Sequence, residues 1–357
     1  MNNLAFIASA VLWTGLTVAA LQPVESKADD SAMSAFNTGD DISQSPGHPN
    51  YFGAFAPELP AMLERAPEID PETGLHVSEV KPGLFFVTEG VYQSAFLATD
   101  DGVIIFDAPP SFAHKLPGVI EKHASGKAIR FLVYSHGHTD HIGGAGVFEN
   151  VEGLDIVAHA DVAASLAKGG RNGLLTPTIT FSEPHEFSLG GQTVTLTPAA
   201  FHAEDVDTII YLPNQKFVIA VDTITPGEVP FMNFGATSDI GAYMTFFDTI
   251  LRYDFDYILS GHVSALGTRE DVLTTRDYAQ DVWDTAGAGM ATFFDKFNVT
   301  FAAFEYKNAN LAYRAAIEEV RRECASAIID RWSDRLSVVD VWADSHCQTV
   351  ILHKIMH

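Results

Sequence analysis

Short apolar runs alternate with turn residues and with helical patterns through the middle of the chain. Three β-hairpins are predicted, and each consists of two apolar runs separated by a polar or glycine-containing turn. They span residues 91–106, 186–198 and 208–221. Apolar residues at helical spacing predict helices over residues 111–124, 161–168 and 239–253. This alternation of strands and helices predicts an α/β protein.

The pattern becomes helical toward the C-terminus, over residues 268–296 and 308–333. We expect this tail to cover the preceding domain, to form a wall of a substrate cleft or to form a dimer face. The only two cysteines, Cys324 and Cys347, lie in it. An oxidising compartment would favour a disulfide between them, and two buried free thiols are the alternative.

A dense group of possible metal ligands follows the apolar run 129–134. Its members are His136, His138, Asp140 and His141. Neutral imidazoles and carboxylates at this density favour zinc or another divalent metal, and a histidine-rich polar turn is the alternative. Residues 142–145 are predicted to begin a helix, which would place the group between a buried strand and a helix.

Three further metal-binding residue types each follow a predicted strand. They are His202, Asp222 and His262. Taken singly, each is typical of a cap or a turn. The C-terminal ends of neighbouring strands meet at one edge of an open α/β sheet, where such proteins place their sites. The three residues are therefore expected to join the first group.

The N-terminal segment is predicted to be a signal peptide over residues 1–28, because residues 4–21 are almost wholly apolar and small residues follow. No Lys or Arg precedes the apolar run, so an uncleaved anchor and an apolar tail stay as alternatives. Residues 29–56 have the composition of a flexible linker. We then expect a catalytic domain over 57–267 and a helical C-terminal extension over 268–357. The protein is accordingly expected to be exported, to the periplasm or the medium.

The charge balance limits the possible partners. The chain has 357 residues, of which 21 are Lys or Arg and 46 are Asp or Glu, for a net charge of −25. Such a surface repels nucleic acid and anionic membranes. We expect a small-molecule substrate, no nucleic acid, and no stable membrane association after signal cleavage.

The order of these residues resembles the metallo-β-lactamase superfamily of metallohydrolases. The resemblance runs from about Leu75 to Val272 and implies a four-layer αββα sandwich. It implies that one metal is bound by His136, His138 and His202 and a second by Asp140, His141 and His262. It also implies that Asp222 bridges both metals and that Asp107, which ends an apolar run, supports the site without binding metal.

The resemblance implies two Zn²⁺ ions per chain, with other divalent metals possible, and hydrolysis by a hydroxide that bridges them. Asp140 would orient this nucleophile. Some zinc β-lactamases have a Cys at the position of Asp222 and a Lys three residues later, where this chain has Thr225. We therefore expect cleavage of a small uncharged ester, lactone, lactam or thioester. The alternatives are a β-lactamase proper, a non-catalytic exported metal-binding accessory protein, and an iron-dependent thiol oxidation.

The loop after Asp222, residues 226–236, is the candidate for substrate contact. Its apolar and amide side chains could form a wall with one hydrogen-bond donor. They are Phe231, Met232, Asn233 and Phe234. The alternative is a loop that packs against the C-terminal tail.

Overall fold

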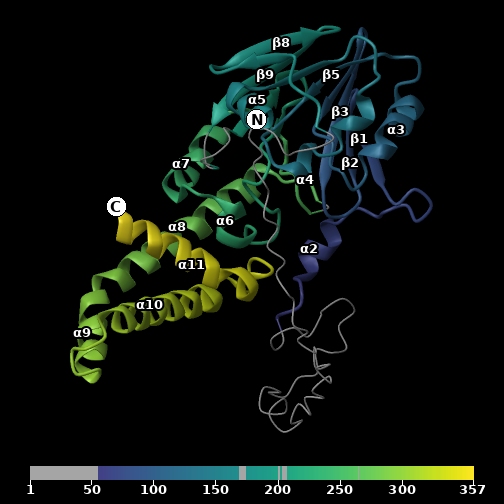
Figure 1. Cartoon of the computed structure of the whole chain (residues 1–357). Helices are drawn as coiled ribbons and strands as arrows, with labels where there is room; N and C mark the ends of the chain where they lie inside the picture. Colours follow the sequence, from purple (N-terminus) through teal and green to yellow (C-terminus); the bar gives the residue numbers. More distant parts are fainter. Residues whose placement is uncertain (1–54, 169–173, 200–201, 203–206, 264) are drawn as a thin grey trace, which may run out of the picture. The chain divides into compact units, whose positions relative to one another are not determined.

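Two β-sheets form the centre of the protein in its computed structural model, and helices cover the outer face of each (Figure 1). The structure describes residues 55–168, 174–199, 202, 207–263 and 265–357. The predicted signal peptide and all but the last two residues of the predicted linker lie outside these residues. Residues 55–357 form one compact unit, which includes both sheets and the C-terminal helices.

The first sheet has seven strands in chain order, antiparallel from β1 to β4 and parallel from β4 to β7. The strands are β1 (His76–Lys81), β2 (Leu84–Thr88), β3 (Gln93–Thr99), β4 (Gly102–Phe106), β5 (Ile129–Val133), β6 (Asp155–His159) and β7 (Ile179–Phe181). Strands β3 and β4 form the first predicted hairpin, with Thr99 paired to Gly102.

The second sheet has five strands in the order β12-β11-β10-β9-β8, antiparallel except for the pair β11–β12. The strands are β8 (His185–Leu189), β9 (Gln192–Ala199), β10 (Asp207–Leu212), β11 (Phe217–Ile219) and β12 (Tyr257–Leu259). The pairs β8–β9 and β10–β11 are the other two predicted hairpins. The last turn contains the short 3₁₀ helix η5 (Pro213–Gln215).

Alternation along the strands divides the apolar side chains between two cores. On β2, Leu84 and Phe86 pack between the sheets, whereas Phe85 and Val87 pack under the first helical layer. This is the period of two that a strand imposes on its side chains. Ile210 and Phe217 of the second sheet complete the core between the sheets. Both faces are thus apolar over β2 to β6 and over β10 to β12, as a four-layer sandwich requires, whereas the outer face of β8 carries the exposed Glu186 and Ser188.

Helices form the two outer layers, and an N-terminal helix, α2 (Pro60–Arg65), precedes β1. On the first sheet lie η3 (Ala113–Lys115), α3 (Leu116–His123), α4 (Thr139–Ile142), η4 (Ala145–Phe148) and α5 (Ala160–Ala167). Around the second lie α6 (Met232–Ala236), α7 (Ile240–Ile250), α8 (Arg269–Ala291), α9 (Phe293–Ala303), α10 (Ala309–Trp332) and α11 (Val339–Met356). The predicted αββα sandwich with a helical C-terminal extension is confirmed.

The C-terminal helices pack on one another and on the second sheet. Helix α10 contacts α8, α9 and α11 (Figure 1). Helix α8 begins with a capping box, in which the side chains of Thr268 and Asp271 bind each other's backbone N–H groups. Within the described residues, none of the helices combines the length and the apolar character that crossing a membrane would require.

The predicted helix start at residues 142–145 is wrong. A short helix, α4, begins earlier, at Thr139, and ends at Ile142. Gly143 and Gly144 follow it because the chain there passes close to other backbone. A Cβ atom on Gly144 would collide with Ala113 and with the carbonyl oxygen of Ala108. The glycines therefore allow a close approach that brings α4 against the end of β4.

Candidate metal centre

All seven predicted ligands lie where strands of the two sheets end. The first four follow β5, in the turn that leads into α4 and within α4 itself. His202 lies between β9 and β10, Asp222 follows β11, and His262 follows β12. Backbone hydrogen bonds join these segments, since Asp222 N–H donates to the carbonyl of Ser260 at 2.9 Å.

The structure brings the ligands together in two groups. One group contains His136, His138, His202 and Asp222, and the other contains Asp140, His141 and His262. Within each group one potential ligand atom per residue lies within 4.8 Å of the others. Each group could hold one metal ion, and the division matches the one that the sequence resemblance implied.

Asp222 lies between the two groups, with one carboxylate oxygen toward each. Its Oδ2 is 3.2 Å from Nε2 of His136 and 3.6 Å from Nδ1 of His138. Its Oδ1 is 3.1 Å from Nε2 of His141 and 2.9 Å from Nε2 of His262. A carboxylate in this position could bind two cations at once.

The electrostatics keep Asp222 ionised. Burial opposes its ionisation, yet the charge of His141 and the close imidazoles of His136 and His138 outweigh burial and hold the pKa of Asp222 well below its usual range. Burial also disfavours the protonated form of His141, but Asp222 and Asp140 raise the pKa of His141 to about 9. The imidazoles thus surround a fixed negative charge.

Several buried polar atoms of this cluster have no hydrogen-bond partner in the described residues. They are Nε2 of His136, Nε2 of His141 and Oδ1 of Asp222. Unpaired buried polar atoms are costly, and native proteins seldom keep them without a compensating ligand. Imidazole nitrogens and carboxylate oxygens are the donors that zinc and related metals take. The residues present therefore fit divalent metal binding.

One side of the cluster is open to solvent. His138, Asp140 and His262 have side chains that are 38%, 39% and 31% exposed, whereas His136 and His141 are buried. Within the part of the chain that the structure describes, a small molecule could approach the centre from the side of these three exposed ligands.

His202 is held by a carboxylate that the sequence analysis missed. Its Nδ1 lies 2.9 Å from Oδ1 of Asp207, and its backbone N–H donates to the same carboxylate. Burial alone would lower the pKa of His202. The hydrogen bond and the charge of Asp207 have a larger effect in the opposite direction, so the pKa of His202 is raised overall. Nε2 of His202 contacts the carbonyl oxygen of Gly235 at 2.8 Å. Asp207 begins a strand five residues after His202, which is the one sequence signal that could have suggested it.

Gln93 is a second residue that sequence reasoning missed. It is almost fully buried at the start of β3, and its side-chain amide makes four hydrogen bonds to the loop that carries His262. Its oxygen accepts from the N–H groups of Ser260 and Gly261, and its nitrogen donates to the carbonyls of Val263 and Ala265. No sequence pattern around a single glutamine in an apolar strand would predict this role.

Asp107 lies behind the cluster and, by its position, supports the turn that carries the ligands. It is fully buried after β4 in the left-handed region, and its Oδ1 accepts the N–H of Ser135 at 2.8 Å. Burial raises the pKa of Asp107 to about 6, against the opposing charge of His141. It belongs to neither group of possible ligands.

The loop after Asp222 only partly matches its predicted role. Phe231 and Met232 are exposed, but Phe234 is fully buried and stacks on His346 of α11 at 4.2 Å between ring centroids. Oδ1 of Asn233 accepts a hydrogen bond from Thr349 of the same helix. Phe234 therefore packs against the tail, the alternative considered above, because this apolar ring finds its partner there rather than in solvent.

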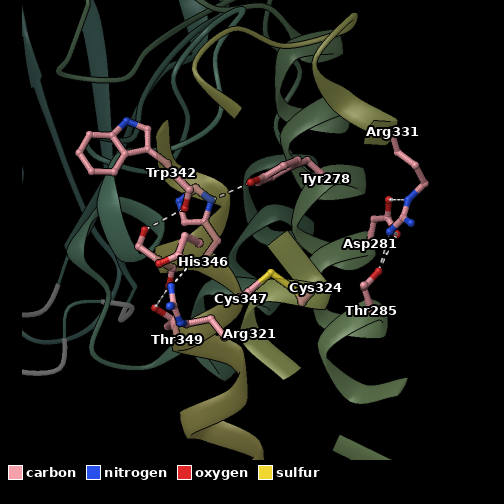
Figure 2. Close-up of a disulfide and its surroundings, with 12 residues drawn as sticks. Tyr278, Asp281, Thr285, Arg321, Cys324, Arg331, Trp342, His346, Cys347 and Thr349 are labelled. Carbon is pink, nitrogen blue, oxygen red and sulfur yellow. Dashed lines mark hydrogen bonds and ion pairs between the residues drawn. A yellow bond between two sulfur atoms is a disulfide. The ribbon is translucent and has the colours of Figure 1, made fainter. Parts of the chain in front are cut away.

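The structure joins Cys324 of α10 and Cys347 of α11 in a disulfide with a Cα–Cα distance of 6.0 Å (Figure 2). Both cysteines are buried, and neither lies in a group of possible metal ligands. The bridge links the last two helices, next to His346.

The fold and the cluster together define a metallohydrolase-type α/β protein with a His/Asp metal-binding site. A model of the metallo-β-lactamase superfamily matches residues 87–262, which include all seven candidate ligands. The matched region, residues 87–262, belongs to the metallo-β-lactamase superfamily.

Similar proteins agree with this assignment. The alpha subunit of 2,4-dinitroanisole O-demethylase from Nocardioides sp. (strain JS1661) is 28% identical over 222 residues, which are 61% of this chain and 65% of the subunit. A UPF0173 metal-dependent hydrolase from Methylocella silvestris is 29% identical over 190 residues, which are 52% of this chain and 77% of that protein. The solved structure of the stereoselective inverting sec-alkylsulfatase Pisa1 from Pseudomonas sp. matches with a TM-score of 0.53 and 15% identity, over 78% of this chain and 50% of that chain. That match shows the fold alone.

Proposed function

We propose that the protein is a binuclear metal-dependent hydrolase that cleaves a small uncharged ester, lactone, lactam or thioester. The single observation that carries this proposal is Asp222, whose two oxygens face two complete groups of ligands. Two bound divalent cations, zinc in our proposal, would supply a water of near-neutral pKa and a Lewis acid for the oxygen that gains charge.

The residues of the cluster would bind the two cations and orient the attacking water. His136, His138 and His202 would hold one cation, His141, His262 and Asp140 the other, and Asp222 would bind both. Asp140 is also the most exposed carboxylate of the cluster, at 39%. It is therefore the group we assign to orient the attacking water and to accept its proton. Water adds to the carbonyl carbon, the bond to the leaving atom breaks, and the proton passes to that leaving atom.

The substrate is expected to be neutral because no basic residue stands at the Lys position of some zinc β-lactamases. Thr225 occupies it and is itself buried. Arg269 does not replace the missing lysine, because its guanidinium donates to the carbonyls of Leu251 and Tyr253. An activated aryl ether is the second candidate substrate, since the relative from Nocardioides is named for the O-demethylation of 2,4-dinitroanisole.

We also propose that the protein is exported. The apolar N-terminal run supports this, and so does the disulfide between Cys324 and Cys347, since such bonds persist in oxidising compartments. Intact-mass analysis of protein from its native host tests the proposal. A mature start near Leu21 or Asp29 is expected, and a full-length mass in the cytosolic fraction would contradict it.

A substrate panel tests the proposed reaction. Metal-replete protein is assayed on neutral esters, lactones, lactams and thioesters and on 2,4-dinitroanisole, with chelator-treated protein as the control. We expect metal-dependent turnover of at least one acyl substrate. Absence of turnover on the whole panel by fully loaded protein would overturn the proposal.

A further inference from the structure

One of the contacts between the C-terminal helices and the loop after Asp222 is made by a buried histidine. His346 of α11 is fully buried and lies between Tyr278 of α8 and the loop after Asp222. The Tyr278 hydroxyl lies 2.8 Å from Nδ1 of His346, and Nε2 of His346 lies 3.1 Å from the carbonyl oxygen of Phe231 (Figure 2). Because a carbonyl only accepts, Nε2 carries the proton of the neutral ring and Nδ1 accepts from Tyr278.

The same loop continues from this anchor to the metal centre. The carbonyl of Phe231 also accepts the N–H of Gly235 at 3.0 Å, and the carbonyl of Gly235 contacts Nε2 of His202. Gly235 has a φ of +72°, and a Cβ atom there would collide with the backbone of Asp222. The loop is thus fixed at one end by α11 and pressed at the other against two candidate ligands.

Beside this anchor lies a small exposed apolar surface. Phe231 is 53% exposed and Met232 is 40% exposed. Trp342 of α11 is half-buried and meets the Phe231 ring edge-on, with 4.9 Å between centroids. Trp342 lies one helical turn before His346, so the two side chains share a face of α11 (Figure 2). We call Phe231, Met232 and Trp342 the apolar patch.

We propose that the apolar patch binds an aromatic or bulky apolar group of the substrate and that His346 positions the patch beside the metal centre. The proposal rests on the proposed hydrolase function and adds the substrate class. The backbone of the patch is linked to the candidate active site through Gly235, whose N–H donates to Phe231 and whose carbonyl contacts His202. Its three residues expose apolar area that the fold leaves uncovered, and an uncharged aryl group matches it in chemistry. The helical extension therefore sets substrate choice.

The main test compares two esters that differ only in an apolar group. Methyl phenylacetate and methyl acetate are hydrolysed by metal-replete full-length protein, and the ratio of their kcat/KM values is the selectivity. We expect Trp342→Ala to lower this selectivity about tenfold, mainly through a higher KM for the phenyl substrate. Leu352→Ala changes an exposed residue of the same helix and should leave the ratio within twofold. An unchanged ratio in Trp342→Ala, or an equal fall in Leu352→Ala, would overturn the proposal.

A binding measurement separates this proposal from the hydrolase function itself. The fluorine NMR line width of 4-fluorophenylacetamide reports weak binding of an uncharged aryl group without any turnover. The line should broaden with the unmodified protein and with Leu352→Ala, and should stay narrow with Trp342→Ala. Equal broadening with all three proteins would refute the patch even if esters are hydrolysed. Selective broadening without turnover would refute only the hydrolase.

The positioning role of His346 has its own test. A glutamine can still donate to Phe231 and accept from Tyr278, whereas a leucine can do neither. We expect His346→Leu to lower phenyl selectivity about tenfold and His346→Gln to restore most of it, with the disulfide intact in both. Selectivity retained in folded His346→Leu would contradict the role. Should this variant not fold, failure of His346→Gln to keep the selectivity would contradict it equally.

Discussion

At the scale of single residues, Asp222 determines whether the centre can hold two cations. Its position between four imidazoles depends on a left-handed backbone, with φ of 65°, and on the hydrogen bond of its N–H to Ser260. A non-glycine residue in this region is strained, and such strain tends to occur at functional sites. The strain turns the carboxylate toward both groups of ligands.

Replacement of Asp222 by asparagine should therefore abolish most activity without unfolding the protein. The amide keeps the volume but lacks the charge that the two proposed cations would need. We expect turnover to fall at least about a hundredfold and bound metal to fall below one equivalent per chain. Rates on the best panel substrate, elemental analysis and circular dichroism check this. Asp248→Asn, at an exposed carboxylate, is the matched control. Near-normal rates in Asp222→Asn would contradict the assignment of this ligand.

Gln93 supports the loop that carries the candidate ligand His262 and is not itself a candidate ligand. Gln93→Leu removes the four hydrogen bonds that shape the loop of His262 while it keeps an apolar stem in the strand. Loss of such supporting contacts typically lowers metal affinity about 10- to 100-fold. We expect competition with a metal-binding dye to show weakened binding of one of the two equivalents. Gln280→Leu, at an exposed glutamine of α8, should bind both normally. Unaltered affinity in Gln93→Leu would show that the loop holds its shape without this residue.

At the scale of elements, the hairpins and helices follow local patterns, whereas the contacts between them do not. Gly102 and Gly190 lie in turns that can be predicted because apolar runs flank them on both sides. The histidine cluster can be located because it follows an apolar strand. By contrast, Gln93 contacts backbone groups 167 to 172 residues away in the sequence. Asp207 contacts the ring of His202 only five residues away, but no residue pattern predicts that contact. Phe234 could be assigned to substrate or to the tail only once the position of α11 was known. Sequence reasoning thus reached the sheets, the candidate ligands and the supporting residue Asp107, but not the supporting residues Gln93 and Asp207.

Helix α11 carries a buried neutral histidine, which predicts an acid-sensitive element. Burial lowers the pKa of His346 from 6.5 to about 4, and Tyr278 is the titratable group that faces it. Above pH 6.5 the ring is neutral in both states. Between pH 6.5 and 4 the unfolded chain binds the proton and the native protein does not, so stability falls as pH falls. Below pH 4 both states are protonated and the loss stops.

We therefore expect this residue to lower the free energy of unfolding by on the order of 3 kcal/mol over that interval. Urea unfolding at several pH values measures it, and His346→Gln isolates it because glutamine does not titrate. The pH dependence of the two proteins should diverge below pH 6.5. If the free energies of unfolding of the two proteins fall in parallel down to pH 4, the pKa of His346 is not lowered in the native protein.

At the scale of the whole molecule, net charge and site chemistry favour the same kind of substrate. The charge of −25 gives no general attraction for anions, and Thr225 offers no cation at the site. The two sheets and the C-terminal helices belong to one compact unit, so the extension can take part in substrate choice.

Neutral lactones and esters should accordingly be better substrates than carboxylated β-lactams. The missing charge-assisted contact costs roughly 1.5–3 kcal/mol of binding, or about tenfold to a hundredfold in efficiency. Values of kcat/KM measured side by side on metal-replete protein check this. Thr225→Lys should narrow the gap if the side chain reaches the cleft. A penicillin or carbapenem turned over a hundredfold faster than every neutral substrate would reverse the ranking.

The metal content of the protein shows whether both groups of ligands bind a cation. Gently purified full-length protein is examined by elemental analysis, together with His262→Ala, in which the second group of ligands is incomplete. We expect close to two divalent ions per chain, with zinc the main metal, and close to one in His262→Ala. A single tightly held iron without zinc, or equal metal content in both proteins, would contradict a binuclear hydrolase.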